Sequence, residues 1–194
     1  PVASCNDKDF QNLMHVYMDA VLYPNIYKHD EIFRQEGWSY KLDSEQDKLV
    51  YNGVVYNEMK GAFSSPEGVL DRVVLNTLFP DTSYANESGG DPEVIPQLTY
   101  EQFLDFHRRY YHPSNSYIYL YGDMDIEEKL IWLDREYLSD FDYQPVDSAI
   151  RRQEPFDAVR ENTIEYSIAS DEPEEDNTYL SYNKVIATSL DKEL

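Results

Sequence analysis

One glutamate near the middle of the N-terminal half, Glu58, is of a residue type that could take part in metal chemistry. It lies in residues 53–61, which read GVVYNEMKG and predict a helix that begins around residues 54–57. Carboxylates bind zinc, but a catalytic zinc takes about three protein ligands, and this stretch contains no histidine. An acid near the start of a helix also complements the helix dipole. Considered alone, Glu58 fits either a metal ligand or a plain helix-dipole interaction.

The four histidines do not suggest a catalytic group. His15 and Asp19 lie one turn apart on a predicted helix, a spacing that could suit a metal pair, but the apolar neighbours favour a half-buried structural histidine. His29 lies in a polar turn and is predicted to face solvent. His107 and His112 are separated by a helix end and do not share a helical face. We expect both to make interdomain hydrogen bonds.

The single cysteine, Cys5, excludes an internal disulfide and a disulfide-stapled secreted module. It lies next to a helix start, where a thiolate can be activated, but no histidine partner is placed beside it, so a structural thiol is expected. No apolar run approaches the roughly twenty residues of a membrane helix. The sequence therefore predicts a protein of the bacterial cytoplasm or an organelle interior that is not secreted and has no membrane partner.

The charge of the chain restricts its partners. There are 38 acidic and 16 basic residues, for a formal net charge of −22. Such a charge repels nucleic acids and anionic membranes and favours neutral or cationic partners. The 18 tyrosines could form a stacking surface, but their neighbours are acidic, which argues against binding of single-stranded nucleic acid. We expect many of these tyrosines to be core and interface residues.

Helices and strands alternate in the predicted structure, which gives an α+β or α/β class, with α+β preferred. Helix signals begin with the apolar spacing of residues 6–22 and continue with a proline-containing start at Ser64 or Ser65, a Thr99-x-x-Gln102 capping box and an Asp125-x-x-Glu128 start. Strands are predicted at 37–42, 116–122, 163–168 and 179–186, and an apolar run covers 49–56. Residues 81–96 are predicted to form a loop, and the acidic residues 154–176 a solvated connector.

Several blocks occur in the order seen in pitrilysin-type zinc metallopeptidases and resemble the presequence-protease branch most closely. They are residues 33–38 (FRQEGW), 53–61, 89–92 (GGDP) followed by Ile95-Pro96, and 106–115 (FHRRYYHPSN). The resemblance covers residues 1–145 well and the rest weakly. No block is specific alone, but their order is. The family's inverted His-x-x-Glu-His motif, which supplies two zinc histidines and the general base, is absent from the chain.

The resemblance implies a fold of pitrilysin-like α/β lobes, with an antiparallel-rich sheet packed against helices. Residues 1–96 would be the later part of the first lobe and residues 97–194 the start of a second, related lobe that includes the acidic connector. By the same resemblance Glu58 is the third zinc ligand. The general-base glutamate would lie upstream, so the chain itself contains no catalytic residue and no site for an organic cofactor.

The preferred hypothesis is therefore a fragment of a zinc metalloendopeptidase that hydrolyses unfolded peptides inside a closed chamber. Its partners would be peptide substrates and the remaining lobes of the same polypeptide. The fragment alone is expected to be inactive and to bind zinc weakly or not at all. A non-catalytic pitrilysin-like subunit is the alternative, although such a subunit has no need to keep Glu58. A third hypothesis, an acidic binding domain with a chance match, is disfavoured by the ordered blocks.

Overall fold

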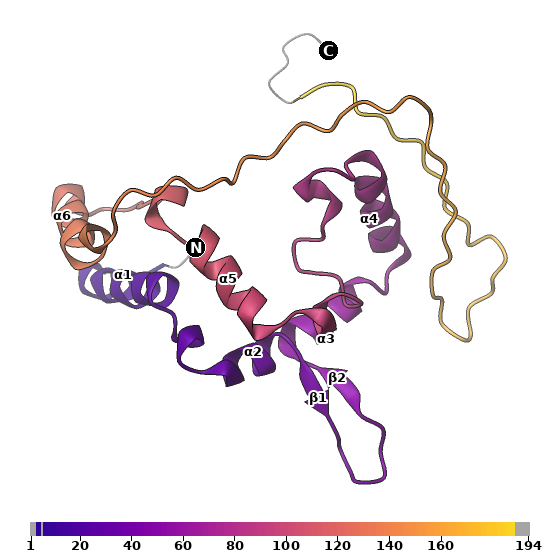
Figure 1. Ribbon diagram of the computed structural model, residues 1–194, viewed down its shortest axis with the longest axis horizontal. Helices are drawn as coiled ribbons and strands as arrows, with labels where there is room; N and C mark the ends of the chain where they lie inside the picture. The colour runs from indigo at the N-terminus through magenta and orange to yellow at the C-terminus, as the bar shows by residue number, and fades with distance from the viewer. Residues whose placement is uncertain (1–2, 5, 189–194) are drawn as a thin grey trace. The chain divides into compact units, whose positions relative to one another are not determined.

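A computed structural model describes residues 3–4 and 6–188, so the prediction for Cys5 lies outside the described residues. The chain divides into two compact units, each built from two segments (Figure 1). Unit 1 comprises Pro1–Arg34 and Leu98–Ala149, and unit 2 comprises Gln35–Gln97 and Ile150–Leu194. No helix in the described part of the chain is both long and apolar enough to cross a bilayer.

Unit 1 is helical. It contains α1 (Asp7–Leu22), α5 (Tyr100–Tyr110) and α6 (Ile126–Glu136), together with most of α2 (Asp30–Glu36) and the 3-10 turns at Asn25–Tyr27, Pro113–Asn115 and Leu138–Asp140. Figure 1 shows α1 and α6 side by side. Their shared core is formed by Met14 and Met18 from α1, Leu133 from α6, and Tyr137 just after it. The four-residue spacing within each pair, Met14 with Met18 and Leu133 with Tyr137, places the two side chains of a pair on one face.

Unit 2 is built around a hairpin that leads directly into a helix. Strands β1 (Ser39–Lys41) and β2 (Val50–Asn52) pair antiparallel, with Tyr40 opposite Tyr51. Helices α3 (Val54–Ala62) and α4 (Pro66–Leu78) follow, and then 3-10 turns at Ser83–Ala85 and Ile95–Gln97. Among the described residues of this unit, Met59 and Ile95 are the buried hydrophobic ones. The combination of helices with a small antiparallel pair confirms the α+β class at this coarse level.

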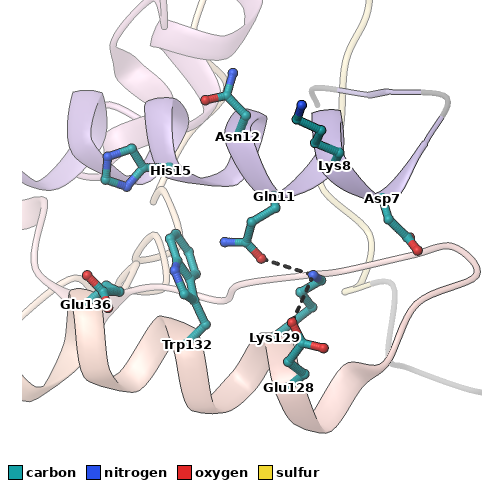
Figure 2. A pocket seen from close by; sticks show the side chains of 9 residues that line it. All are labelled: Asp7, Lys8, Gln11, Asn12, His15, Glu128, Lys129, Trp132 and Glu136. Carbon is teal, nitrogen blue, oxygen red and sulfur yellow. Dashed lines mark hydrogen bonds and ion pairs between the residues drawn. The ribbon is translucent and has the colours of Figure 1, made fainter.

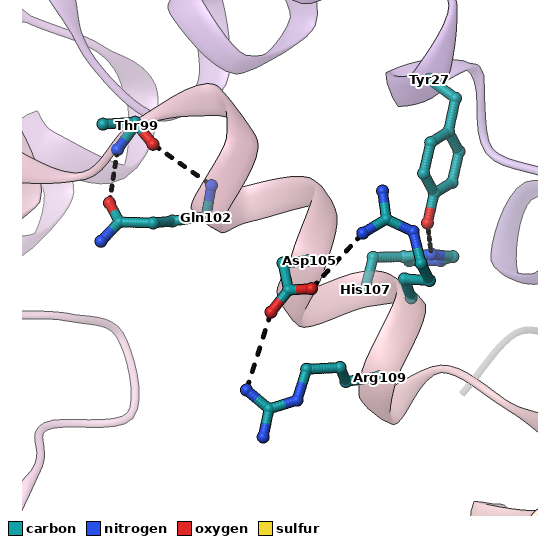
Figure 3. Close-up of polar contacts among 7 residues, drawn as sticks. Tyr27, Thr99, Gln102, Asp105, His107 and Arg109 are labelled. Atoms are coloured by element: carbon teal, nitrogen blue, oxygen red, sulfur yellow. Dashed lines mark hydrogen bonds and ion pairs between the residues drawn. The ribbon is translucent and has the colours of Figure 1, made fainter.

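The predicted helix starts agree with the structure because local hydrogen bonds fix them. Ser65 caps α4 by accepting a hydrogen bond from the amide of Gly68, and Asp125 caps α6 in the same way through Glu128. In α5 the capping box is complete, since the Thr99 hydroxyl accepts from the Gln102 amide while the Gln102 side chain accepts from the Thr99 amide (Figure 3). Such caps satisfy amides that have no partner inside the helix.

Three predicted strands are wrong: the structure has no strand at 116–122, 163–168 or 179–186. Their side chains are largely in solvent, as shown by Tyr117, which is fully exposed, and by Leu180, which is 96% exposed. A strand needs a hydrogen-bonded neighbour, and two strands alone are already marginal. Among the described residues no segment pairs with these three, so their β-forming composition does not produce a sheet.

Residues 150–188, the described part of the last segment of unit 2, are extended and attached to α4 and the chain after it. Gln153 exchanges two hydrogen bonds with Asp81, and Asn162 donates to the Thr77 hydroxyl over 2.7 Å. Residues 154–176, predicted as an acidic connector, contain no helix or strand. These side-chain contacts, and no backbone ladder, hold the described part of this segment in place.

Candidate functional site

The helix that carries Glu58 begins without a capping side chain, because its N-cap residue is Gly53. A backbone group from before the hairpin takes that role. The carbonyl of Gly37 accepts a hydrogen bond from the amide of Tyr56, in the first turn of α3, at 3.3 Å. A Cβ atom on Gly53 would lie 2.2 Å from the same carbonyl oxygen. The contact that caps α3 therefore requires a glycine at position 53.

Glu58 is the fifth residue of α3 and so lies in the second turn. The description of Glu58 as an acid at the helix start is therefore wrong, and α3 has no acid in its first turn. Because the influence of the helix dipole falls off within the first turn, this position weakens the helix-dipole explanation. The side chain is exposed, and among the described residues none forms a hydrogen bond or ion pair with its carboxylate. Glu58 is thus available to an external ligand.

An aromatic cluster joins the hairpin to the start of α3. Tyr40 and Tyr51 stack with their ring centres 5.4 Å apart, and Tyr51 meets Trp38 and Tyr56 edge-on. The negative charge that a second phenolate at Tyr40 would bring raises the pKa of Tyr51 above its ordinary value. These aromatic contacts stabilise the hairpin against the first turn of the helix.

Helix α3 also contacts the glycine-containing loop. Met59, the residue after Glu58, is buried, and a Cβ atom on Gly89 would lie 2.3 Å from its sulfur. The loop is tied to α4 by an ion pair between Asp91 and Arg72, whose closest atoms are 3.8 Å apart. The backbone carbonyl of Asp91 also accepts the amide of Ile95. The GGDP block therefore packs under the helix that carries Glu58.

The described residues do not form a complete metal site. No group of three or more His, Cys, Asp or Glu side chains is close enough, within the described ranges, to hold an ion. A single unpaired, exposed carboxylate fits one zinc ligand by its chemistry, but a catalytic zinc needs about three. By its chemistry Glu58 therefore fits one zinc ligand, and the described residues do not supply a set of three.

His15 is exposed, so the prediction of a half-buried histidine is wrong, but it has a structural partner. The Tyr137 hydroxyl donates to the His15 carbonyl, with 2.9 Å between the oxygens, and lies 2.8 Å from the Nδ1 atom of the same residue. Since a phenol has one proton, Nδ1–H is the donor in the second bond. His29 is exposed, as predicted.

His107 in α5 and His112 just after it have different kinds of partner. His107 contacts the Tyr27 hydroxyl through Nδ1 at 2.8 Å (Figure 3). It also contacts the Val21 carbonyl through Nε2 at 3.0 Å. It therefore joins the two segments of unit 1, which lie on either side of the predicted boundary at residues 96 and 97. His112 accepts from the Ser114 amide and meets Phe141 edge-on, and neither of these partners lies across that boundary.

Sequence reasoning missed a pocket of about 640 Å³ between α1 and α6 (Figure 2). Its notable residue is Lys129, which is 7% exposed and donates to Gln11 Oε1 at 3.0 Å. The spacing of Lys129 with Trp132, Leu133 and Tyr137 is the signal that could have found it, since these positions share one helix face. The lining contains three acids and two lysines, so it does not favour a ligand of either charge. Its residues are Asp7, Lys8, Gln11, Asn12, His15, Glu128, Lys129, Trp132 and Glu136.

Comparison with known proteins gives consistent matches. Residues 97–192 match the family model described as Peptidase M16 inactive domain. The chain is 56% identical over 193 residues to Protein HypA of Clostridium perfringens. The matched region is 100% of the chain and 20% of that relative. It is 49% identical over 145 residues to presequence protease 1, chloroplastic/mitochondrial, of Arabidopsis thaliana, covering 75% of the chain and 13% of the relative.

A mitochondrial presequence protease of Drosophila melanogaster is also similar, with 49% identity over 160 residues that cover 79% of the chain and 15% of the relative. The chain thus spans a fifth or less of the length of these relatives. The blocks that carried the resemblance in the sequence, including the residues around Glu58, fall within a chain that matches Protein HypA along its whole length.

Proposed function

Because the chain belongs to the M16 peptidase family, we propose that a parent protein of the length of its relatives is a zinc metalloendopeptidase in which Glu58 is the third zinc ligand. The observation that carries this proposal is the exposed, unpaired carboxylate of Glu58, held on a helix that contacts both the Gly37 carbonyl and the loop at Gly89. The presequence proteases among the relatives support the peptidase class. We place the parent in the bacterial cytoplasm or in an organelle.

Zinc, when bound, would supply a Lewis acid for the scissile carbonyl and would lower the pKa of the attacking water. Glu58 would contribute one anionic oxygen ligand, and α3 would orient it. The other ligands and the general base would come from the parent's upstream residues. The remaining lobes would complete a closed chamber that takes unfolded peptides. In this proposal residues 1–96 complete the first lobe, and residues 97–194 begin the second.

A second candidate is a non-catalytic subunit of the same fold. It is favoured by the description of the matched model, an inactive domain. The retained Glu58 favours the enzyme, because an exposed acid without a partner contributes nothing to the packing of unit 2.

The deciding experiment measures zinc content and cleavage of a quenched unfolded peptide in the full-length parent and in its Glu58→Gln variant, after both are shown to be folded. Glu101→Gln, which removes another exposed helical acid, is the matched control. Joint loss of zinc and cleavage in Glu58→Gln alone supports the proposal. Unchanged zinc and cleavage place the ligand elsewhere. A folded wild type with neither zinc nor cleavage identifies the non-catalytic subunit.

A further inference from the structure

We propose that Gly53 and Gly89 are positioning residues for the metal ligand, because they allow backbone and loop to approach α3 closely enough to set the place of Glu58. This inference rests on the proposed function. The new element is that the position of the Glu58 carboxylate depends on two glycines. In this proposal neither glycine touches metal or substrate.

At Gly53 the argument rests on backbone contact. The nearest atoms to a Cβ at this position are the carbonyl oxygen of Gly37 at 2.2 Å, its carbon at 2.7 Å, and the Cα of Trp38 at 2.8 Å. These are backbone atoms, which cannot relieve the clash by a change of rotamer as a side chain can. An alanine must therefore move the N-terminus of α3 away from Gly37, and the hydrogen bond from the Tyr56 amide to that carbonyl is then lost. Glu58, one turn further along the same helix, moves with it.

At Gly89 the contact is with a side chain. A Cβ there would lie 2.3 Å from the sulfur and 2.9 Å from the terminal methyl of Met59. Met59 is flexible in principle but is buried, so its side chain has little room to move. The Asp91–Arg72 ion pair also restrains the loop. Part of the displacement therefore falls on α3 at the residue next to Glu58, with a smaller effect than at Gly53.

Gly61 provides an internal comparison. It lies on the same helix, three residues after Glu58, and nothing lies within 4 Å of a Cβ built there. Alanine at this position fills open space and has a better helix propensity than glycine. If glycines in this region served only to loosen the chain, all three substitutions would act alike. The packing predicts that alanine at position 53 or 89 displaces Glu58, and that alanine at position 61 does not.

Metal ligation depends on ligand placement, and changes in residues that orient ligands typically weaken metal affinity about 10- to 100-fold. We therefore expect Gly53→Ala in the full-length parent to raise the zinc dissociation constant about 10- to 100-fold. Gly89→Ala should fall at or below about tenfold, the lower end of that range. Gly61→Ala should leave zinc affinity unchanged.

The experiment titrates zinc into the metal-free, full-length parent and these three variants with a competing chelator, and records thermal unfolding and circular dichroism of the same samples. A merely structural role lowers the unfolding temperature but leaves the zinc affinity of the folded protein unchanged. That outcome overturns the proposal, as does an equal loss of affinity in Gly61→Ala.

A second test rests on Gly89 alone, so it remains available if the Gly53→Ala protein does not fold. Met59→Ala removes the atoms that a Cβ at position 89 would meet. In a double-mutant cycle, Gly89→Ala should weaken zinc binding in the wild-type background and have little effect beside Met59→Ala. Equal effects in both backgrounds contradict the steric mechanism.

Glu58→Gln in the same titration distinguishes failure of the proposed function from failure of the positioning role. If it retains wild-type zinc affinity, the proposed function fails, and the glycine results no longer concern a ligand. If it loses zinc while Gly53→Ala and Gly89→Ala retain it, the proposed function stands and the positioning role is wrong.

Discussion

At the scale of single residues, Glu58 should be dispensable for folding. Its carboxylate is exposed, with no partner among the described residues, and alanine has a higher helix propensity than glutamate. We expect Glu58→Ala to change the unfolding free energy of this chain by less than about 0.5 kcal/mol, as measured by urea denaturation. A loss above about 2 kcal/mol would show that Glu58 has a structural role and would remove the argument that it is kept for a ligand.

Tyr137, in contrast to Glu58, should contribute to folding stability. It is 3% exposed, and its hydroxyl contacts both the carbonyl and Nδ1 of His15. Tyr137→Phe leaves those two groups without this partner, and we expect a loss of about 1–3 kcal/mol at neutral pH. The control is Tyr143→Phe, at a residue that is 83% exposed. Equal effects of the two substitutions in denaturant titrations would contradict the buried hydrogen-bonded role.

The same tyrosine predicts a pH dependence. Burial raises the pKa of Tyr137 above its ordinary value of 10.0. A group whose pKa is raised in the folded state stabilises that state below the unfolded value, and this contribution is lost as pH rises through the folded value. Stability should therefore fall from about pH 10 upward, and less steeply in Tyr137→Phe. Urea denaturation at a series of pH values checks this, and an unchanged slope would contradict it.

At the scale of elements, the capping box of α5 should contribute measurably to unit 1. The Thr99 hydroxyl and the Gln102 side chain each satisfy an amide at the helix start. We expect Thr99→Ala to lower the unfolding free energy by about 1 kcal/mol. Thr163→Ala, in an exposed segment without helix or strand, is the control. No difference between them in thermal unfolding would show that the box is not a stabilising feature.

Elements that local chemistry determines were predictable from the sequence, and those that need a distant partner were not. The starts of α4, α5 and α6 follow from Ser65, Thr99 and Asp125, whose partners lie three residues away. The predicted strand at 116–122 depended on neighbours that the described chain does not provide. At the candidate site, the sequence indicated a helix that carries Glu58. It could not show that the Gly37 carbonyl caps that helix, since this contact depends on how the hairpin closes.

At the scale of the whole molecule, the isolated chain should bind zinc only weakly. The described residues contain no group of three metal-binding side chains, and Glu58 supplies a single ligand. With a net charge of −22 we expect loose, salt-sensitive binding of divalent cations, which Mg²⁺ should also show. Calorimetry with Zn²⁺ and Mg²⁺ tests this expectation. Tight, stoichiometric zinc in this chain would contradict it.

The exposed apolar side chains of the extended segments lead to a second expectation at this scale. Ile186 is 73% exposed and Leu180 is 96% exposed, while the negative charge keeps copies apart at low salt. Added NaCl shortens the Debye length to roughly 3 Å at 1 M. We therefore expect light scattering to show self-association of the isolated chain that increases with salt. A monomer at every salt concentration would indicate that these side chains are covered in solution.

The Gly37–Tyr56 hydrogen bond also has a consequence for the order of folding. It closes a loop of only about twenty residues, most of it the hairpin itself, and closure entropy is small for so short a loop. Contacts between residues near in sequence form faster than contacts between distant segments. The hairpin and α3 can thus assemble early, as one kinetic unit. A growing polypeptide would already have the Glu58 carboxylate at its place on the helix when residues far away in the sequence arrive.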